Sequence, residues 1–237
     1  MSLAEKRIVI FGGSLGIGLA TARIAVEAGA KVTIVGRSEE KLRAAQNELK
    51  KVEIAVADAA DETAVNRVFA ELETVDHVYN AAGAFVGGSI LENSADFYRN
   101  VFEARIWGSF YIVRAAFPKM QPNGSFVFTG GVSTARPVPG AWATAVATAA
   151  AEQMARALAV EIAPLRVNAV APGWTDTPMW DDIFGDGKQE IFAGVADKLL
   201  TKRLATAEEV AQAVIFLMGN NSITGETIHI EGGHRLV

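Results

Sequence analysis

Glycines are concentrated at one turn near the start of the chain, at a spacing that suits nucleotide binding. An apolar run at 7–11 leads directly into Gly12-Gly13-Ser14-Leu15-Gly16-Ile17-Gly18, and a helical pattern follows. Glycine lets such a turn adopt positive φ and lets the backbone approach a ligand closely. The N-terminus of the following helix offers free N–H groups and a positive dipole to a pyrophosphate. The turn therefore predicts dinucleotide binding, although a tight strand–helix turn can also need glycine for packing alone.

The residues after the second apolar run indicate which dinucleotide would bind. An acidic side chain there would hydrogen-bond the ribose 2′-OH and favour NAD. The sequence instead has Gly36, Arg37 and Ser38. A guanidinium together with a hydroxyl suits a 2′-phosphate, so we expect NADP as the cofactor. Ser38 is also a suitable helix N-cap, and both roles can hold at once.

Short apolar runs alternate with helical patterns along the whole chain. The runs lie at 7–11, 31–35, 52–56, 77–80, 125–128, 167–170 and 227–230, and the helical patterns at 16–28, 39–50, 62–72, 95–120, 141–162 and 207–218. This alternation predicts an α/β fold with a doubly wound parallel sheet of about seven strands, Rossmann-like, in a single domain over 1–237. Residues 180–200 interrupt the alternation, and we expect a lid-like excursion there.

Composition and charge exclude several classes of protein. The 237 residues are 50% hydrophobic and include no cysteine, so a disordered chain, a disulfide scaffold and a Cys-ligated metal site are excluded, and no metal is expected. The net charge of −5 gives no indication of nucleic-acid binding. No uncharged run reaches the roughly 18 residues of a membrane span, and no signal peptide is recognisable. We expect a cytoplasmic protein with a small-molecule ligand of unknown identity.

The motifs, taken in order, resemble those of the short-chain dehydrogenase/reductase family. Gly12, Gly16 and Gly18 follow the family's spacing of glycine, three residues, glycine, one residue, glycine. The segment 80–83 resembles its N-N-A-G, with Ala81 in place of the second Asn, and 166–173 resembles its R-V-N-x-x-x-P-G. The resemblance implies a dinucleotide site formed by Gly12, Ser14, Leu15, Gly16, Ile17, Gly18, Arg37, Ser38, Asp58, Asn80, Ala81, Gly83, Pro172, Gly173, Thr175 and Thr177. Within it, Asp58 would contact adenine and Thr177 the carboxamide or phosphate side.

The same resemblance exposes a departure at the catalytic positions. Enzymes of this family use Ser, Tyr, Lys and Asn, and alignment places Gly131, Thr144, Thr148 and Arg105 at those four positions. No tyrosine follows Tyr111, so a small alignment shift cannot restore the proton donor. A threonine hydroxyl lacks the acidity of a tyrosine beside a cation. Catalytic residues are therefore unknown, and the chain is identified as an atypical member of the family.

Other side chains could contribute to the pocket. We expect His77 to be structural, Tyr98 to pack, Ser133 to lie on the pocket rim, and Trp142 and Trp174 to flank it. His234 could approach a neighbouring active site in an oligomer. A buried cation needs a partner, and for Arg105 we favour a protein carboxylate such as Glu103 or Asp176 over an acidic ligand or the cofactor.

Two functions remain open at this point. One is an NADP-dependent oxidoreductase acting on a substrate that needs little acid catalysis, such as an iminium or an activated C=C. The other is a non-catalytic dinucleotide-binding sensor or subunit. In either case the resemblance implies a homodimer or homotetramer. Its contact would be the alanine-rich helix at 141–159 and the long helix before it, whose small residues permit close approach.

Overall fold

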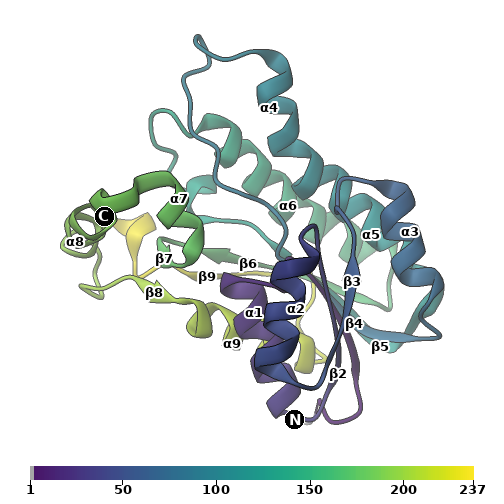
Figure 1. Cartoon of the computed structure of the whole chain (residues 1–237). Coiled ribbons are helices and arrows are strands. Elements are labelled where there is room, and N and C mark those ends of the chain that lie inside the picture. Colours follow the sequence, from purple (N-terminus) through teal and green to yellow (C-terminus); the bar gives the residue numbers. More distant parts are fainter. Residues whose placement is uncertain (1–2) are drawn as a thin grey trace.

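Within residues 3–237, which the computed structural model describes, seven parallel strands form the central sheet (Figure 1). Their order is β3-β2-β1-β4-β5-β6-β9, and each neighbouring pair is parallel. The strands are β1 (Arg7–Phe11), β2 (Lys31–Gly36), β3 (Val52–Val56), β4 (Val75–Asn80), β5 (Met120–Thr129), β6 (Arg166–Pro172) and β9 (Thr227–Ile230). The predicted α/β class and doubly wound seven-stranded sheet are confirmed.

Helices cover both faces of this sheet (Figure 1). On one face α1 (Gly16–Glu27), α2 (Glu39–Leu49) and α9 (Ala207–Gly219) share a hydrophobic core with the strands. On the other face the covering helices are α3 (Glu62–Ala70), α5 (Gly108–Ala116) and α6 (Trp142–Glu161). No helix among the described residues is long and apolar enough to cross a membrane.

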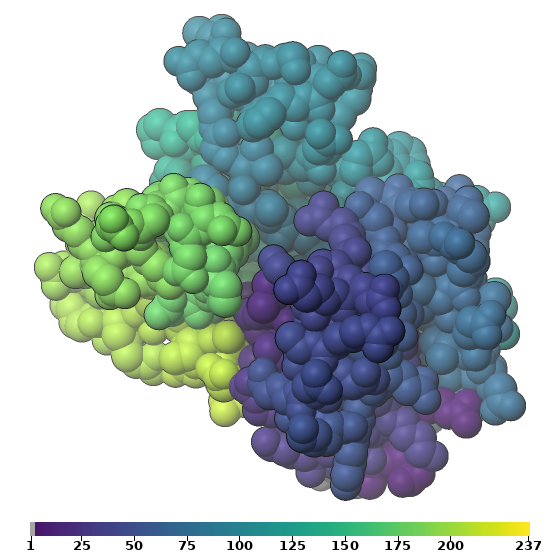
Figure 2. Space-filling view, viewed as in Figure 1, coloured from purple at the N-terminus to yellow at the C-terminus, as the bar shows by residue number. Residues whose placement is uncertain are grey.

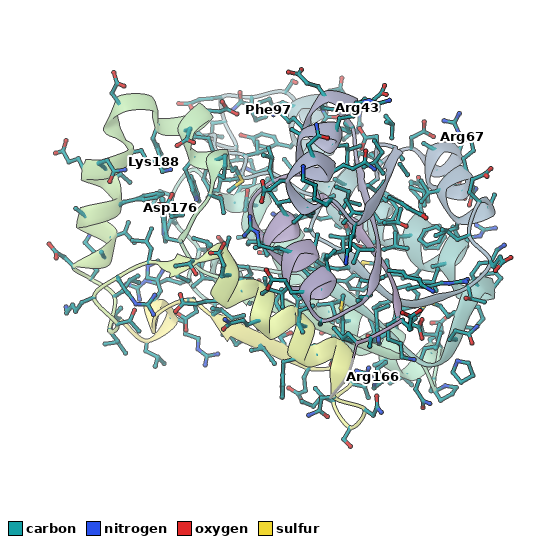
Figure 3. All side chains as sticks on the ribbon, turned by 60° about the horizontal axis from the view of Figure 1, so that its bottom comes forward. Arg43, Arg67, Phe97, Arg166, Asp176 and Lys188 are labelled. Carbon is teal, nitrogen blue, oxygen red and sulfur yellow. The ribbon has the colours of Figure 1, made fainter. Side chains whose placement is uncertain are left out.

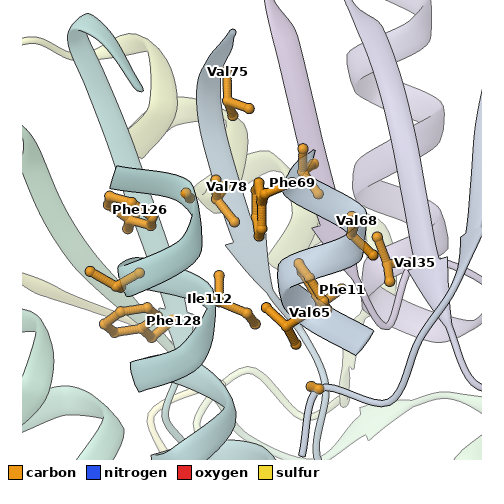
Figure 4. Close-up of a cluster of buried hydrophobic side chains, with 14 of the residues drawn as sticks. Phe11, Val35, Val65, Val68, Phe69, Val75, Val78, Ile112, Phe126 and Phe128 are labelled. Atoms are coloured by element: carbon orange, nitrogen blue, oxygen red, sulfur yellow. The ribbon is translucent and has the colours of Figure 1, made fainter. Parts of the chain in front are cut away.

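The strands at the centre of the sheet are buried on both faces, as their apolar composition predicts. Every residue of β4 and β6 is buried. Figure 4 shows one of the two large cores, in which Phe11 and Phe126 from the sheet meet Phe69 of α3 and Ile112 of α5. Full burial of each such side chain contributes about 1.5–3 kcal/mol, so these contacts hold the carboxyl ends of the strands in fixed positions.

The expected continuous helix at 95–120 is interrupted in the structure. It divides into α4 (Ala95–Phe102), a π-helical segment (Glu103–Trp107) and α5, and β5 already begins at Met120. The Ser109 hydroxyl donates to the Arg105 carbonyl at 2.6 Å and accepts from the Asn80 amide at 3.0 Å. Within the π-helical segment the backbone bonds shift by one residue, as in the bond from the Gly108 N–H to the Glu103 carbonyl, and π-helical turns often mark functional sites.

The small residues of the alanine-rich helix are used inside the chain. Ala143 and Ala147 of α6 are buried against Tyr98 and Val101 of α4, and Ala151 faces the sheet core. The prediction that such alanines form the contact with a second copy is therefore wrong for these three positions, because they are already covered.

Residues 180–200 leave the strand–helix order. They form the short helices α7 (Asp181–Phe184) and α8 (Lys188–Ala196), separated by a 3₁₀ turn. The two ends of this segment are joined by a small parallel pair, β7 (Thr175–Asp176) with β8 (Ala205–Thr206). The excursion thus hangs from the carboxyl end of β6, beside the edge where ligands bind in folds of this class.

Candidate functional site

A cavity of about 530 Å³ opens at the carboxyl ends of the strands. In the space-filling view the surface is hollowed between the green segment that holds α7 and α8 and the purple-blue region of α1 and α2 (Figure 2). The cavity is lined by the glycine-rich turn, by residues 129–133 and by all residues of 172–182 except Asp176. Its position at the switch in strand order, where β1 lies between β2 and β4, is that of a ligand site.

The glycines of the turn are required by the space around them. Gly12 has φ +75°, and a Cβ there would lie 3.0 Å from the backbone of Ala81 and Ala82. A Cβ on Gly18 would lie 2.1 Å from the carbonyl oxygen of Gly12. The turn can therefore close against α1 only with glycine at these two positions.

The N-terminus of α1 is left open toward the cavity. Leu15 is the N-cap, and no side chain of the described residues caps this end. Leu15, Gly16, Ile17 and Gly18 all line the cavity. The unpaired N–H groups and the helix dipole make this end suitable for a phosphate group.

Most of the predicted dinucleotide residues come together around the cavity. Those that line it are Gly12, Leu15, Gly16, Ile17, Gly18, Ala81, Gly83, Pro172, Gly173, Thr175 and Thr177. Thr177 lies beside the turn, since a Cβ on Gly16 would be 3.3 Å from its Cγ2 atom. The structure thus brings the end of the 172–177 segment into contact with the glycine turn at the cavity.

Five predicted residues, Ser14, Arg37, Ser38, Asp58 and Asn80, are not among those lining the cavity. The Ser38 hydroxyl caps α2 by accepting from the Lys41 N–H at 3.3 Å. Asp58 accepts from the Ala60 N–H at 3.0 Å within its own turn. Buried Asn80 accepts from the Ala82 N–H at 3.0 Å and so braces the loop after β4. These three side chains shape the backbone around the site.

The end of β2 carries two cations without acidic partners among the described residues. Arg37 is exposed and makes no ion pair, and Lys41, one turn into α2, lines the cavity. Arg43 on the same helix is instead paired with Glu39 at 2.6 Å. Sequence reasoning missed Lys41, although its position four residues after Arg37 could have indicated it.

The four positions singled out from the resemblance meet at one wall of the cavity, which is lined by Arg105, Gly131, Thr144 and Thr148. The Thr144 hydroxyl both donates to the Val86 carbonyl and accepts from the Val86 N–H, each at 3.1 Å. The Thr148 hydroxyl donates to the Ala145 carbonyl at 3.0 Å. Both hydroxyl protons are therefore engaged by the backbone.

Arg105 does not pair with a carboxylate, which corrects the expectation from sequence. Its Nη1 donates to the Thr129 carbonyl at 2.9 Å, and its buried Nε has no acceptor. Asp176 is paired with Lys188 at 2.8 Å instead. Burial lowers the pKa of Arg105, but a guanidinium stays charged near neutral pH.

Two further polar groups lie at this wall. Buried Glu152 accepts from the Gly131 N–H at 3.2 Å and from the Thr134 hydroxyl at 2.7 Å. The Tyr79 hydroxyl lies 3.0 Å from the Thr129 hydroxyl, and burial raises the pKa of Tyr79 to about 12. Tyr79 is thus a weaker acid than a free tyrosine, although it borders the cavity.

Aromatic side chains form the cavity wall where the lid-like segment begins. Trp174 stacks on Trp180 with ring centroids 4.7 Å apart, and Phe85 lies 5.4 Å from Trp180 on the cavity side. Trp142 does not flank the pocket as expected, because it packs against Tyr98 at 4.8 Å and Phe102 at 6.3 Å. One of the two predicted tryptophans thus packs with Tyr98 and Phe102 of α4.

Of the remaining candidate residues, two are structural and two line the cavity. His77 is buried with Nδ1 2.9 Å from the Ser125 hydroxyl, and burial lowers the pKa of His77 to about 4, so its role is structural. Tyr98 is buried and donates to the Ser89 carbonyl at 2.5 Å, so it packs as predicted. Ser133 and His234 both line the cavity of their own chain.

The excursion is fastened to the rim by Lys188. Its ammonium lies 2.8 Å from Asp176 on β7 and 2.7 Å from Asp181 on α7, and Figure 3 shows Lys188 beside Asp176. The ammonium also lies 5.2 Å from the centre of the Phe192 ring. These contacts hold the first turn of α8 against the cavity mouth.

Comparison with known proteins finds one family over nearly the whole chain. Residues 12–235 match the family model described as enoyl-(acyl carrier protein) reductase. The chain is 32% identical to the 3-oxoacyl-[acyl-carrier-protein] reductase FabG of Chlamydia muridarum, over 98% of each chain. Among solved structures, the MalC reductase/Diels-Alderase from Malbranchea aurantiaca is similar with a TM-score of 0.93, 28% identity and coverage of 99% of this chain and 98% of that one.

A second solved structure bears on the unusual wall of the cavity. It is an NADPH-bound short chain oxidoreductase from Pseudomonas aeruginosa that contains an atypical catalytic center. The TM-score is 0.90 at 27% identity, and the match covers 97% of this chain and 98% of that chain.

Proposed function

The chain belongs to the short-chain dehydrogenase/reductase family, and from this premise we propose that it is an NADPH-dependent oxidoreductase for a substrate needing little proton donation. The observation that carries the proposal is a cavity that the glycine turn and the adjacent Thr177 line together and that continues to the wall of Arg105. One end of this cavity suits a dinucleotide, and the other leaves room for a reacting molecule.

The residues present fit a dinucleotide. Glycine is required at 12 and 18 by backbone contacts, and the α1 N-terminus is uncapped. A pyrophosphate at this helix end would accept from its free N–H groups. Thr175 and Thr177, both buried in the segment that lines the cavity next to the turn, would hold the nicotinamide end.

Charge at the end of β2 supports NADP over NAD. Arg37 and Lys41 are cations without acidic partners, and no carboxylate occupies positions 36–38. A 2′-phosphate would be bound by such cations, whereas NAD would gain little from them. The Ser38 hydroxyl already caps α2, so the preference for NADP rests mainly on Arg37 and Lys41.

The proposed chemistry follows from which side chains of the wall can donate a proton. Bound NADPH supplies a hydride. The hydroxyl protons of Thr144 and Thr148 are held by backbone carbonyls, so neither is free to protonate a carbonyl oxygen. Arg105 offers positive charge to a developing anion without giving up its proton. An activated C=C, whose reduction develops an enolate anion, suits this arrangement. An iminium, the other candidate, needs no proton but would be repelled by the Arg105 cation.

We also propose that residues 180–200 act as a lid. The segment hangs from the β7–β8 pair and is fastened by the Lys188 ion pairs with Asp176 and Asp181. Its Trp180, Asp181 and Asp182 line the cavity. Opening and closing of such a segment would exclude water from the site during transfer.

A second candidate function, a non-catalytic dinucleotide sensor or subunit, is favoured by the same engaged hydroxyls. The Pseudomonas aeruginosa oxidoreductase, which holds NADPH beside an atypical catalytic center, supports the catalytic alternative. Both candidates share the dinucleotide site and differ only in turnover.

The experiment is a titration with NADPH and NADH, followed by turnover of a panel containing a simple ketone, a cyclic iminium and an enone. We expect NADPH to bind and the ketone to react below about 0.1 per second, since loss of a general acid lowers a typical rate of about 10 per second by roughly 10² or more. Turnover of the iminium or enone supports the enzyme. Binding without any turnover supports the sensor. Ketone reduction at a typical rate contradicts the inference that this wall lacks a free proton donor.

A further inference from the structure

Arg105 is a buried cation whose charge no carboxylate in residues 3–237 neutralises. The π-helical turn directs it to the cavity wall, where only 9% of the residue is exposed. Its single hydrogen bond goes to the neutral Thr129 carbonyl, and its Nε is buried without an acceptor. Because a buried charge is costly unless it is paired, this wall favours a ligand that brings a negative charge.

Two carboxylates near the cavity are engaged elsewhere. Asp181 is paired with Lys188, and Glu152 accepts from Gly131 and Thr134. No carboxylate of the described residues lies within ion-pair distance of Arg105. The second terminal nitrogen, Nη2, also has no protein partner, so the guanidinium keeps donors available to a molecule in the cavity.

The cavity wall where the lid-like segment begins is aromatic. Trp180 is fixed by a 2.9 Å hydrogen bond from its indole N–H to the Thr175 carbonyl. Trp174 lies nearly parallel to it, at 17°, and Phe85 borders it at 5.4 Å. All three line the cavity. Rigid rings of this kind favour a planar apolar ligand over an extended polar one.

We propose that the substrate part of the cavity binds a planar aromatic acid, with its carboxylate paired to Arg105 and its ring packed beside Phe85 and Trp180. The inference rests on the proposed function, which assigns the other part of the cavity to the dinucleotide. Arg105 then serves as the anchor that selects the substrate, and the aromatic wall sets the shape of what it accepts.

The test compares 2-naphthoate with 2-naphthamide, which share a ring system and differ in charge. Calorimetric titrations use the full chain, with and without saturating NADP⁺. We expect the wild type to bind the acid about tenfold or more tightly than the amide, as for one charge-assisted hydrogen bond. Quenching of tryptophan fluorescence by both probes would report contact with the aromatic wall.

Variants assign the selectivity to Arg105. In Arg105→Gln the acid should fall to the affinity of the amide while amide binding is retained, and Arg105→Lys should restore part of the difference. Arg136, which also lines the cavity, provides the matched comparison: Arg136→Gln should leave most of the preference for the acid. Thermal unfolding and NADPH titration of each variant establish that the site is folded.

Equal affinity of the wild type for acid and amide overturns the inference without any variant. Loss of the preference in Arg136→Gln but not in Arg105→Gln also overturns it. So does an Arg105→Gln variant that loses NADPH affinity and keeps the preference, because Arg105 would then serve the cofactor. A wild type that binds naphthoate but not NADPH contradicts the proposed function alone, so the two failures are distinguishable.

Discussion

At the scale of single residues, two neighbouring cations at the end of β2 determine the local charge that a dinucleotide would meet. Arg37 is exposed without an ion pair, and Lys41 reaches the cavity from the first turn of α2. Each could bind one face of a 2′-phosphate, while Arg43 is held by Glu39. The three side chains differ in their partners, although they lie within one short stretch of chain.

Replacement of Arg37 or Lys41 by alanine should therefore weaken NADPH binding and spare NADH. We expect about a tenfold loss for each, because each removes one charge-assisted contact to phosphate. Fluorescence titration with both dinucleotides measures the ratio. Arg43→Ala is the control and should leave it unchanged. A wild type with equal affinities for NADPH and NADH would contradict the assignment.

His77 links acid sensitivity to a single buried side chain. Burial lowers the pKa of His77 to about 4 from its ordinary 6.5, outweighing the opposite effect of Asp76, while Arg166 and Lys6 lower it further. Below pH 6.5 the unfolded chain takes up a proton that the folded chain refuses, so stability is present above 6.5 and is lost as pH falls toward 4.

The expected loss at pH 5 is about 2 kcal/mol relative to pH 7, from the difference between these pKa values. Urea unfolding at the two pH values measures it. His77→Gln should reduce the pH dependence by this amount, whatever its own effect at pH 7. An unchanged dependence in the variant would show that other groups, such as Asp76, account for acid sensitivity.

At the scale of elements, the strand–turn–helix unit at the start of the chain depends on how closely α1 approaches the turn. In Gly18→Ala the added Cβ would lie 2.1 Å from the Gly12 carbonyl oxygen, so α1 must shift away. We expect stability to fall by about 1–3 kcal/mol and NADPH affinity by about tenfold or more, since the helix N-terminus would leave the phosphate position.

Gly194→Ala is the matched control for this variant. Gly194 lies within α8, where a Cβ would have nothing within 4 Å. This change should raise stability by about 0.5–1 kcal/mol, the usual helix preference for alanine, and leave NADPH binding intact. Thermal unfolding and dinucleotide titration of both variants decide the matter, and equal behaviour would argue against a close turn–helix contact.

Among the elements, the regular strands and helices were predictable from the sequence, whereas features set by tertiary contacts were not. Strongly apolar strands and periodic helices were predictable because local burial patterns determine them, and the strands met in the expected sheet. The π-helical break at 103–107 was not, because no residue type or spacing in this segment marks the shift from one backbone bond pattern to the other. The position of Trp142 behind α4 likewise depends on Tyr98 and Phe102, which no spacing along the chain reveals.

The candidate site was predictable to a similar degree. Glycines 12, 16 and 18 line the cavity because their spacing itself requires a tight turn. The partner of Arg105 was expected to be a carboxylate, but Asp176 is taken by Lys188. Which ion pairs form depends on the three-dimensional arrangement of the side chains. The unpaired positive charge of Arg105 therefore became visible only in the fold.

At the scale of the whole molecule, exposed aromatic side chains gather on the helices at one face. Trp107 and Phe110 lie with ring centroids 6.0 Å apart and are roughly half exposed, and Tyr111 lies against both. Val146 on α6 is also half exposed. Apolar surface of this kind favours association with another chain, and the buried alanines of α6 cannot provide it because they are already packed.

We therefore predict that the chain forms a homodimer, or a tetramer built from such dimers, through α5 and the exposed face of α6. Phe110→Glu and Val146→Glu each place a charge where a second copy would bury apolar surface, so both should shift the assembly toward monomer at micromolar concentration. Light scattering measures the mass.

Leu91→Glu, at an exposed apolar residue in the loop after β4, is the control and should leave the mass unchanged. A monomeric wild type would refute the prediction. An oligomer that survives both charged variants would place the contact on another face of the molecule.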